Sequence, residues 1–219
     1  MRIPLAKYGI REILLFGGLS LVGIGLSAWF ARILVPLFML ALAFILYFFR
    51  DPSRRAPTAP AIVLSPADGR VVEVAETVSP SSLLEGPAHK IAIFMSPLDV
   101  HVNRSPCRGR VETIERRPGR FLRADRAAAS AENESNAIAM ADVEGQSVRL
   151  LVRQVAGRLA RRIVCGVAEG DRLERGQRIG MIKFGSRAEV YVPVQSGFEV
   201  LVSLGQRVRA GETILGRFR

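Results

Sequence analysis

The stretch Gly170-Asp-Arg-Leu-Glu-Arg-Gly-Gln-Arg-Ile179 recurs 35 residues later as Gly205-Gln-Arg-Val-Arg-Ala-Gly-Glu-Thr-Ile214. The two copies share the pattern G-x-R-[LV]-x-x-G-x-x-I. Each copy has a turn bounded by glycines, and the residues after it are typical of a strand. The repeat therefore predicts a quasi-symmetric β-sandwich or barrel.

Lys183-Phe-Gly-Ser186 lies between the two copies and allows two interpretations. The repeat resembles the barrel-sandwich hybrid of lipoyl and biotinyl carriers, in which a lysine on a hairpin tip takes the cofactor. The Glu-x-Lys-like setting of those carriers is missing here, and Gly-Ser follows the lysine instead. Gly-Ser is common in turns between strands, but it also places a hydroxyl beside the carbonyl that a backbone N→O acyl shift requires.

Upstream of the repeat, short runs alternate apolar with polar residues and are separated by turn signals. One short helix is expected between Leu122 and Glu134, where alanines and charged residues occur without proline. Residues 61–219 are therefore predicted to form a mainly β domain, barrel-sandwich-hybrid-like, with one or two short helices. The predicted strands are 62–64, 70–74, 90–95, 110–114, 148–154 and 162–167.

Two apolar runs begin the chain, Ile13 to Phe30 and Ile33 to Phe49. Each is close to the roughly 20 residues that cross a bilayer core, so residues 1–50 are predicted to form a transmembrane helical hairpin. Basic residues flank both ends, which favours the cytoplasmic side for both. A signal peptide is the alternative, but no Ala-x-Ala-like cleavage site is evident. Residues 51–60 form a proline-rich linker.

Composition limits the classes of partner. The net charge is +11 and hydrophobic residues make up 49% of the chain, which fits a membrane portion and an anionic partner. A nucleic-acid binder is disfavoured because aromatic residues are sparse in the basic stretches and no helix-turn-helix or zinc spacing appears. No metal site is expected from the two cysteines, Cys107 and Cys165, or the two histidines, His89 and His101.

Three further stretches hold residues capable of chemistry. Asp68 stands in a turn in Leu64-Ser-Pro-Ala-Asp-Gly-Arg70, where an aspartate before glycine usually caps its own backbone. His101 lies in the polar loop after the strand predicted to end at Met95, although a single histidine is more often structural. The run from Arg153 to Arg162 is basic, and a solvated basic face is the more common explanation for such a run.

In their order along the chain, these stretches resemble phosphatidylserine decarboxylase proenzymes of the short bacterial and archaeal type. The resemblance runs from the end of the predicted hairpin almost to the C-terminus. The matching residues are Phe49-Arg-Asp-Pro52, Ser65-Pro-Ala-Asp-Gly69, Ile93-Phe-Met-Ser-Pro-Leu-Asp-Val-His-Val-Asn-Arg104, Arg153-Gln-Val-Ala-Gly157, Ala160-Arg-Arg-Ile163 and Phe184-Gly-Ser-Arg187.

The resemblance implies self-cleavage at Gly185-Ser186. The Ser186 hydroxyl would attack the Gly185 carbonyl to form an ester, and β-elimination would leave dehydroalanine at position 186. Hydrolysis with loss of ammonia would convert that residue to a pyruvoyl group, the covalent cofactor. The two chains, 1–185 and 186–219, would stay together as a heterodimer.

The resemblance also implies roles for His101 and Asp68. His101 would be the base for self-cleavage and Asp68 the group that orients it. Longer members of the family carry a second histidine three places after the first, where this chain has Arg104. His101 would therefore serve both self-cleavage and decarboxylation, or Arg104, Asn103 or a water would take one of the two steps.

The implied reaction converts phosphatidylserine to phosphatidylethanolamine through a Schiff base between the substrate amine and the pyruvoyl group. His101 would return a proton to carbon after carbon dioxide leaves. The catalytic domain is expected at the cytoplasmic side of the cell membrane, facing anionic lipid. Candidate substrate-binding residues are Arg153, Arg158, Arg161, Arg162, Asn103 and Arg104.

Two other functions stay open on the residues alone. One is a pyruvoyl decarboxylase acting on another amino-containing substrate, against which the membrane hairpin argues. The other is a membrane-anchored, lipoyl-like adaptor domain without catalysis. Such adaptors carry long coiled-coil heptads that are absent here, and their domain lies outside the cytoplasm, contrary to the charge bias.

Overall fold

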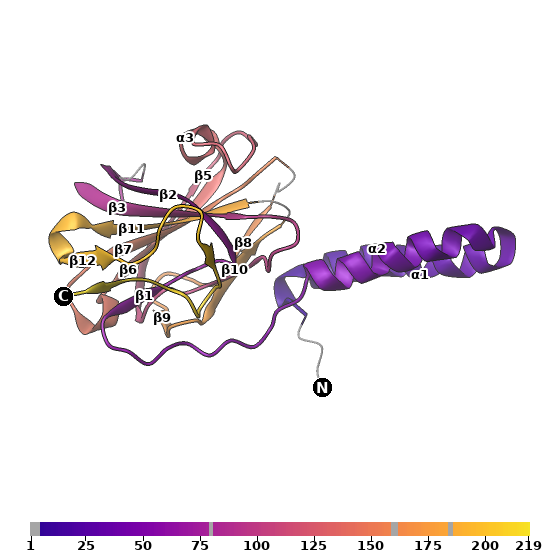
Figure 1. The fold of residues 1–219 in the computed structure, drawn as a ribbon, viewed down its shortest axis with the longest axis horizontal. Helices are drawn as coiled ribbons and strands as arrows, with labels where there is room; N and C mark the ends of the chain where they lie inside the picture. The colour runs from indigo at the N-terminus through magenta and orange to yellow at the C-terminus, as the bar shows by residue number, and fades with distance from the viewer. Residues whose placement is uncertain (1–4, 79–80, 159–161, 184–185) are drawn as a thin grey trace. The chain divides into compact units, whose positions relative to one another are not determined.

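The computed structural model describes residues 5–78, 81–158, 162–183 and 186–219. It divides into two compact units, residues 1–53 and 54–219. The first is helical and the second is mainly β, as Figure 1 shows. The predicted mainly β class for the second unit is thereby confirmed.

The helical unit contains η1 (Lys7–Gly9), α1 (Ile10–Phe30), η2 (Arg32–Leu34) and α2 (Val35–Phe48). The chain before α1 meets the chain after α2, because the Ala6 amide donates to the Phe49 carbonyl at 2.8 Å. The segment Lys7–Phe30 is long and apolar enough to cross a membrane, whereas Arg32–Phe48 is apolar but shorter. The first predicted run therefore lies in a helix long enough to span a bilayer, and the second lies in a shorter apolar helical segment.

The helical unit buries small residues and exposes large ones. The buried positions of α1 are Gly17, Ser20, Gly23 and Ser27, which recur every three or four residues. A Cβ on Gly23 would lie 2.5 Å from the ring of Phe38 on α2, so the close approach of the two helices requires glycine there. Small residues at the seam and large apolar residues outside are typical of helix pairs in lipid rather than in water.

The second unit is built on an eight-stranded sheet with the order β13-β2-β3-β11-β7-β6-β5-β9. All neighbouring strands in it are antiparallel. The strands are β13 (Arg207–Val208), β2 (Gly69–Val78), β3 (Pro87–Met95), β11 (Ser186–Pro193), β7 (Leu150–Val155), β6 (Ser135–Ala141), β5 (Gly109–Arg117) and β9 (Arg172–Leu173).

Two three-stranded sheets cover one face of this large sheet and enclose the core. Ile93, Val152 and Val190 of the large sheet belong to the same buried cluster as Val63 and Ile182 of the small sheets. The orders are β1-β14-β12 and β4-β10-β8. Their strands are β1 (Ile62–Leu64), β14 (Ile214–Phe218), β12 (Phe198–Val200), β4 (Val102–Arg104), β10 (Arg178–Ile182) and β8 (Ile163–Cys165).

The strand orders reveal an approximate two-fold symmetry within the described strands. The large sheet reads the same from both edges if β13, β2, β3 and β11 are matched to β9, β5, β6 and β7. The same operation matches β1-β14-β12 to β4-β10-β8. The axis passes between Val190 and Val152, which pair at the centre of the sheet.

Turn hydrogen bonds support the symmetry in detail. The Gly211 amide donates to the Ser65 carbonyl at 2.8 Å, and the Gly176 amide donates to the Ser105 carbonyl at 2.9 Å. Both glycines have φ near +71°, a left-handed conformation that favours glycine. The repeat predicted from the sequence is thus reflected in matched turns.

A second repeat escaped the sequence analysis. Ser65-Pro-Ala-Asp-Gly-Arg-Val71 and Ser105-Pro-Cys-Arg-Gly-Arg-Val111 share S-P-x-x-G-R-V. In both copies the serine hydroxyl donates to the carbonyl two residues on, at 2.6 Å and 2.8 Å. The helix expected between Leu122 and Glu134 is only α3 (Ala128–Glu132), because the segment before it forms turns instead. Two short 3₁₀ segments, η3 (Val143–Gly145) and η4 (Val194–Ser196), also lie in this unit.

Candidate active site

Ser186 is the first residue of β11, the strand next to the pseudo-two-fold axis. It pairs with Met95 at the end of β3, and its side chain is completely buried on the core face of the sheet. The Ser186 hydroxyl lies 3.9 Å from the Met95 sulfur, which is a weak acceptor. Gly185, the other half of the predicted cleavage site, lies outside the described residues.

A chain of buried amides leads away from this serine. Asn103 Nδ2 lies 3.7 Å from the Met95 sulfur and 3.5 Å from the Pro66 carbonyl. Gln154 Nε2 donates to Asn103 Oδ1 at 2.8 Å, and Asn136 Nδ2 donates to Gln154 Oε1 at 3.0 Å. Because a carbonyl can only accept, Pro66 fixes the direction of the whole chain. Its far end, Asn136 Oδ1, has no partner in the described part of the chain.

His101 is completely buried in the loop that enters β4. Its carbonyl accepts the amide of Ile182 at 3.3 Å, so it lies beside the segment that leads to Ser186. His101 Nδ1 lies 2.9 Å from the Asp99 carbonyl. Since a carbonyl only accepts, Nδ1 carries the hydrogen of the neutral ring and Nε2 holds the lone pair that a base needs.

Asp68 bonds groups other than His101, the partner that the family resemblance implies. Its Oδ2 accepts from Arg54 Nη2 at 2.8 Å, and its Oδ1 accepts from the Ala210 amide at 2.7 Å. Burial raises the pKa of Asp68 above its ordinary value, against the opposing effects of the Ala210 amide and Arg54. No hydrogen bond joins Asp68 to His101 among the described residues, so the orienting role of Asp68 stays a prediction.

Arg54 and Asp99 were missed by the sequence analysis. Arg54 bridges Asp68 and Glu212 through two ion pairs of 2.8 Å, and so fixes the linker to the β unit. Asp99 also accepts from the amide and hydroxyl of Ser96, which closes the turn after β3. Arg54 lies just after a quoted motif and its partners are distant in sequence, whereas Asp99 lies within a quoted motif and its partners are Ser96 and His101.

The predicted substrate-binding arginines occupy unlike environments. Arg153 is buried and donates to Ser135 and Glu189, while Arg158 and Arg162 are exposed. Arg161 lies outside the described residues. Arg104 is buried and donates to the Gly176 carbonyl at 2.9 Å. A role for any of them, or for Asn103, in substrate binding stays a prediction.

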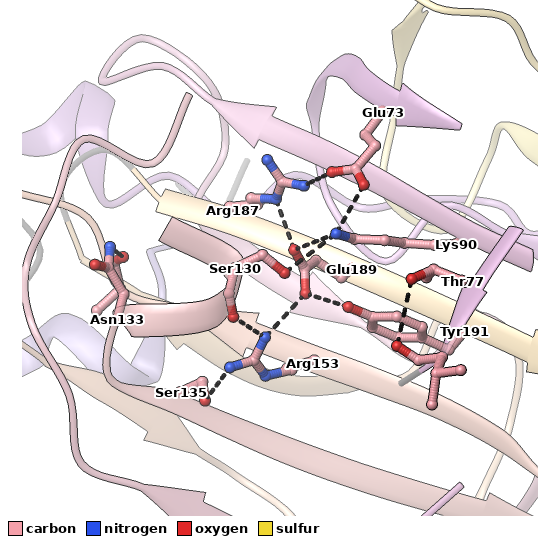
Figure 2. Close-up of polar contacts among 12 residues, drawn as sticks. Glu73, Thr77, Lys90, Ser130, Asn133, Ser135, Arg153, Arg187, Glu189 and Tyr191 are labelled. Carbon is pink, nitrogen blue, oxygen red and sulfur yellow. Dashed lines mark hydrogen bonds and ion pairs between the residues drawn. The ribbon is translucent and has the colours of Figure 1, made fainter. Parts of the chain in front are cut away.

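A buried ion cluster lies on the opposite face of β11, beneath α3 (Figure 2). Its centre is Glu189, which pairs with Arg187 at 2.7 Å, Arg153 at 3.2 Å and Lys90 at 3.7 Å. Arg187 also pairs with Glu73, and the Tyr191 hydroxyl donates to Glu189 at 2.9 Å. Burial alone would raise the pKa of Glu189, but the three cations outweigh it and lower the pKa. Arg187 and Glu189 thus attach the start of β11 to β2, β3 and β7.

The described residues hold no group of three or more histidine, cysteine or acidic side chains that could bind a metal ion. Cys107 is fully buried, and burial raises the pKa of its thiol far above the usual range. A thiol of that kind is a poor nucleophile. Cys107 is therefore not a competing nucleophile for Ser186.

Comparison with known proteins gives a consistent result. A family model described as phosphatidylserine decarboxylase matches residues 41–216. The chain is 43% identical over 221 residues to the phosphatidylserine decarboxylase proenzyme of Carboxydothermus hydrogenoformans, covering 100% of both chains. It is 42% identical over 216 residues to that of Desulfotalea psychrophila, covering 99% of this chain and 97% of the relative. The proenzyme of Salinibacter ruber is 49% identical over 196 residues, 87% of this chain and 83% of the relative.

Proposed function

This chain belongs to the phosphatidylserine decarboxylase family and decarboxylates phosphatidylserine to phosphatidylethanolamine, and we propose that it does so with a pyruvoyl group made by self-cleavage at Gly185-Ser186. The observation that carries the proposal is the position of Ser186. It is a buried serine that begins a central strand, where the new chain would also begin.

The surroundings of Ser186 suit the pyruvoyl group. The only hydrogen-bond partner of its hydroxyl among the described residues is the Met95 sulfur at 3.9 Å, so losing the hydroxyl breaks no strong hydrogen bond. The group, once formed, supplies the electron sink for decarboxylation. Its position would be kept by β11, which is paired with β3 on one side and β7 on the other.

His101 is the proposed base for self-cleavage and the proposed proton donor for decarboxylation. The Asp99 carbonyl supports this role because it fixes hydrogen on Nδ1, so that Nε2 is the basic nitrogen of the neutral ring. Asp68 would act from a buried ion pair with Arg54, and burial raises its pKa above the ordinary value. Asn103 and Arg104 follow His101 on β4 and would line the same region.

We further propose that α1 and α2 anchor the protein in the cell membrane with the β unit on the cytoplasmic side. The apolar length of Lys7–Phe30 and the seam of small residues on α1 support a membrane location. Basic residues at the outer ends of the two helices support the orientation. A substrate whose acyl chains stay in the bilayer would then reach a site held near its surface.

An intact-mass measurement on the purified protein tests the proposal. We expect two chains split after Gly185, with the smaller one carrying a pyruvoyl group at its N-terminus. We also expect carbon dioxide release from phosphatidylserine in detergent micelles, and none from free serine. A single chain that never processes would refute the proposed cleavage, and activity on free serine would point to the other pyruvoyl decarboxylase function.

A further inference from the structure

A polar cavity of about 310 Å³ opens beside Asp68 at the same end of the large sheet as Ser186. Its lining contains two carboxylates and two guanidinium groups. The Met95 that pairs with Ser186 leads directly into the turn that ends at Asp99, one of the lining residues. The full lining is Asp68, Gly69, Asp99, Arg207, Val208, Arg209 and Thr213.

The carboxylates of this cavity are already satisfied by the protein. Asp68 accepts from Arg54 and from the Ala210 amide, and Asp99 accepts from the amide and hydroxyl of Ser96. Arg207 and Arg209, in contrast, are exposed and have no ion pair among the described residues. The hydrogen-bonding groups still available to a ligand in this cavity are therefore the two guanidinium groups.

The pseudo-two-fold axis provides an internal comparison, a cavity of about 370 Å³ at the equivalent place. There the repeat puts Arg172 at the position of Arg207 and Glu174 at that of Arg209. Arg108 stands where the first cavity has Asp68, and it lies 3.9 Å from Glu174. Among the described residues, two of the three arginines in the second cavity, Arg108 and Arg110, lie within 4.0 Å of acids, whereas neither arginine of the cavity near Ser186 has an ion pair.

We infer that Arg207 and Arg209 bind the phosphodiester of the lipid substrate in the cavity beside Asp68. The inference rests on the proposed function, and it assigns the headgroup contact to residues outside the arginine-rich run 153–162. Guanidinium groups match phosphate oxygens geometrically and stay charged at every physiological pH. Leu98, which precedes Asp99 and is 61% exposed, would offer apolar surface to the glycerol and acyl part.

The first test measures binding without catalysis. The full-length Ser186→Ala proenzyme in detergent is titrated with glycerophosphoserine, a soluble probe that carries the phosphodiester, and binding is followed by calorimetry. Combining Arg207→Gln with Arg209→Gln should weaken binding roughly tenfold or more, since each charge-assisted hydrogen bond is worth about that factor. The matched control Arg172→Gln, at the equivalent place, should leave the affinity unchanged.

The second test uses the processed enzyme on phosphatidylserine in neutral detergent micelles. The double variant should raise KM roughly tenfold or more while kcat changes little, because substrate is held less tightly but the reacting groups are untouched. Intact mass confirms that the variants are folded well enough to process. In the double variant, lysine in place of glutamine at position 207 should give a smaller rise in KM, since Arg207→Lys keeps the charge but not the fork geometry.

Unchanged affinity and KM in the double variant would overturn the assignment of Arg207 and Arg209. The proposed function would survive that result if the wild type still decarboxylates the lipid. A KM effect that appears only when anionic non-substrate lipid is added would also overturn the assignment, because it would reflect attraction to the surface. Competition of free inorganic phosphate with the probe at equal concentration would overturn the assignment to the lipid headgroup, because the site would then recognise phosphate alone.

Discussion

The two ends of the β unit share one architecture but differ in chemistry. The pseudo-two-fold axis between Val190 and Val152 carries Ser186 onto Val148, which packs against the core without a polar group. It carries Asn103 and Gln154 onto Val63 and Val192, which are completely buried. The end that holds Ser186 therefore has polar residues at positions where the other end has valine.

This difference separates the residues that serve the chemistry from those that hold the symmetric scaffold. Buried polar groups cost free energy unless they are paired, so the Ser186 end needs its amide chain and the Val148 end does not. The scaffold is held by features common to both ends, such as the matched glycine turns at Gly176 and Gly211. Substitutions at equivalent positions should thus separate effects on chemistry from effects on stability.

The largest effect is expected from Ser186→Ala. Without the hydroxyl no ester can form, so we expect complete loss of cleavage and of decarboxylation, with the fold retained. The equivalent substitution, Val148→Ala, should lower the free energy of unfolding by roughly 0.5–3 kcal/mol but leave cleavage intact. Intact mass and thermal unfolding measure the two properties, and a cleaved Ser186→Ala protein would contradict the assignment.

Asp68→Asn should slow self-cleavage by roughly 10²–10⁴-fold if the carboxylate supports the base. The equivalent residue on the other end is Arg108, and Arg108→Gln should leave the cleavage rate unchanged. The time course of cleavage on denaturing gels measures both. Equal rates in Asp68→Asn and the wild type would show that the Asp99 carbonyl alone orients His101.

Glu189→Gln should lower the free energy of unfolding by about 3–5 kcal/mol, because Arg187, Arg153 and Lys90 would be left buried without their shared carboxylate. The pseudo-two-fold axis relates Glu189 to Leu151, so among the described residues the ion cluster has no counterpart at the other end of the β unit. Urea unfolding of the uncleaved Ser186→Ala background isolates the effect from processing. A change below about 1 kcal/mol would mean that Glu73 alone compensates the cations.

The position equivalent to Gln154 at the other end holds Val192, so Gln154→Val introduces that residue type into the amide chain. It leaves Asn103 Oδ1 and Asn136 Nδ2 without their partner, so we expect a loss of about 1–3 kcal/mol in unfolding free energy. Cleavage should slow as well, because Asn103 lies next to Met95 and Ser186. The converse variant, Val192→Gln, should destabilise the fold without changing the cleavage rate per folded molecule.

The smallest effect is expected from pH. Because the pKa of Glu189 is lowered in the folded state, its stabilising contribution is complete above its ordinary value of 4.5 and is lost as pH falls through the folded pKa. Unfolding free energy of the Ser186→Ala proenzyme should therefore decline below about pH 4.5. Glu189→Gln should flatten this part of the curve, and identical slopes in both proteins would contradict the role of Glu189.

Much of the fold could be predicted from local sequence patterns. The apolar runs, the glycine-bounded turns of the 35-residue repeat and most strands depend on periodicity and turn residues within a few positions. The second repeat at Ser65 and Ser105 was also present in the sequence and was overlooked. The helix before Glu134 was overestimated because helix propensity in that segment gave way to turns.

By itself, the sequence determined the class of fold, the family and the serine at the predicted cleavage site, because these depend on short ordered motifs. Only the tertiary structure decided the partners of the site residues. Asp68 meets Arg54, His101 meets a backbone carbonyl, and Arg153 meets Glu189 across two strands. The physical reason is that strand register and burial, which no local pattern specifies, decide which polar groups face one another.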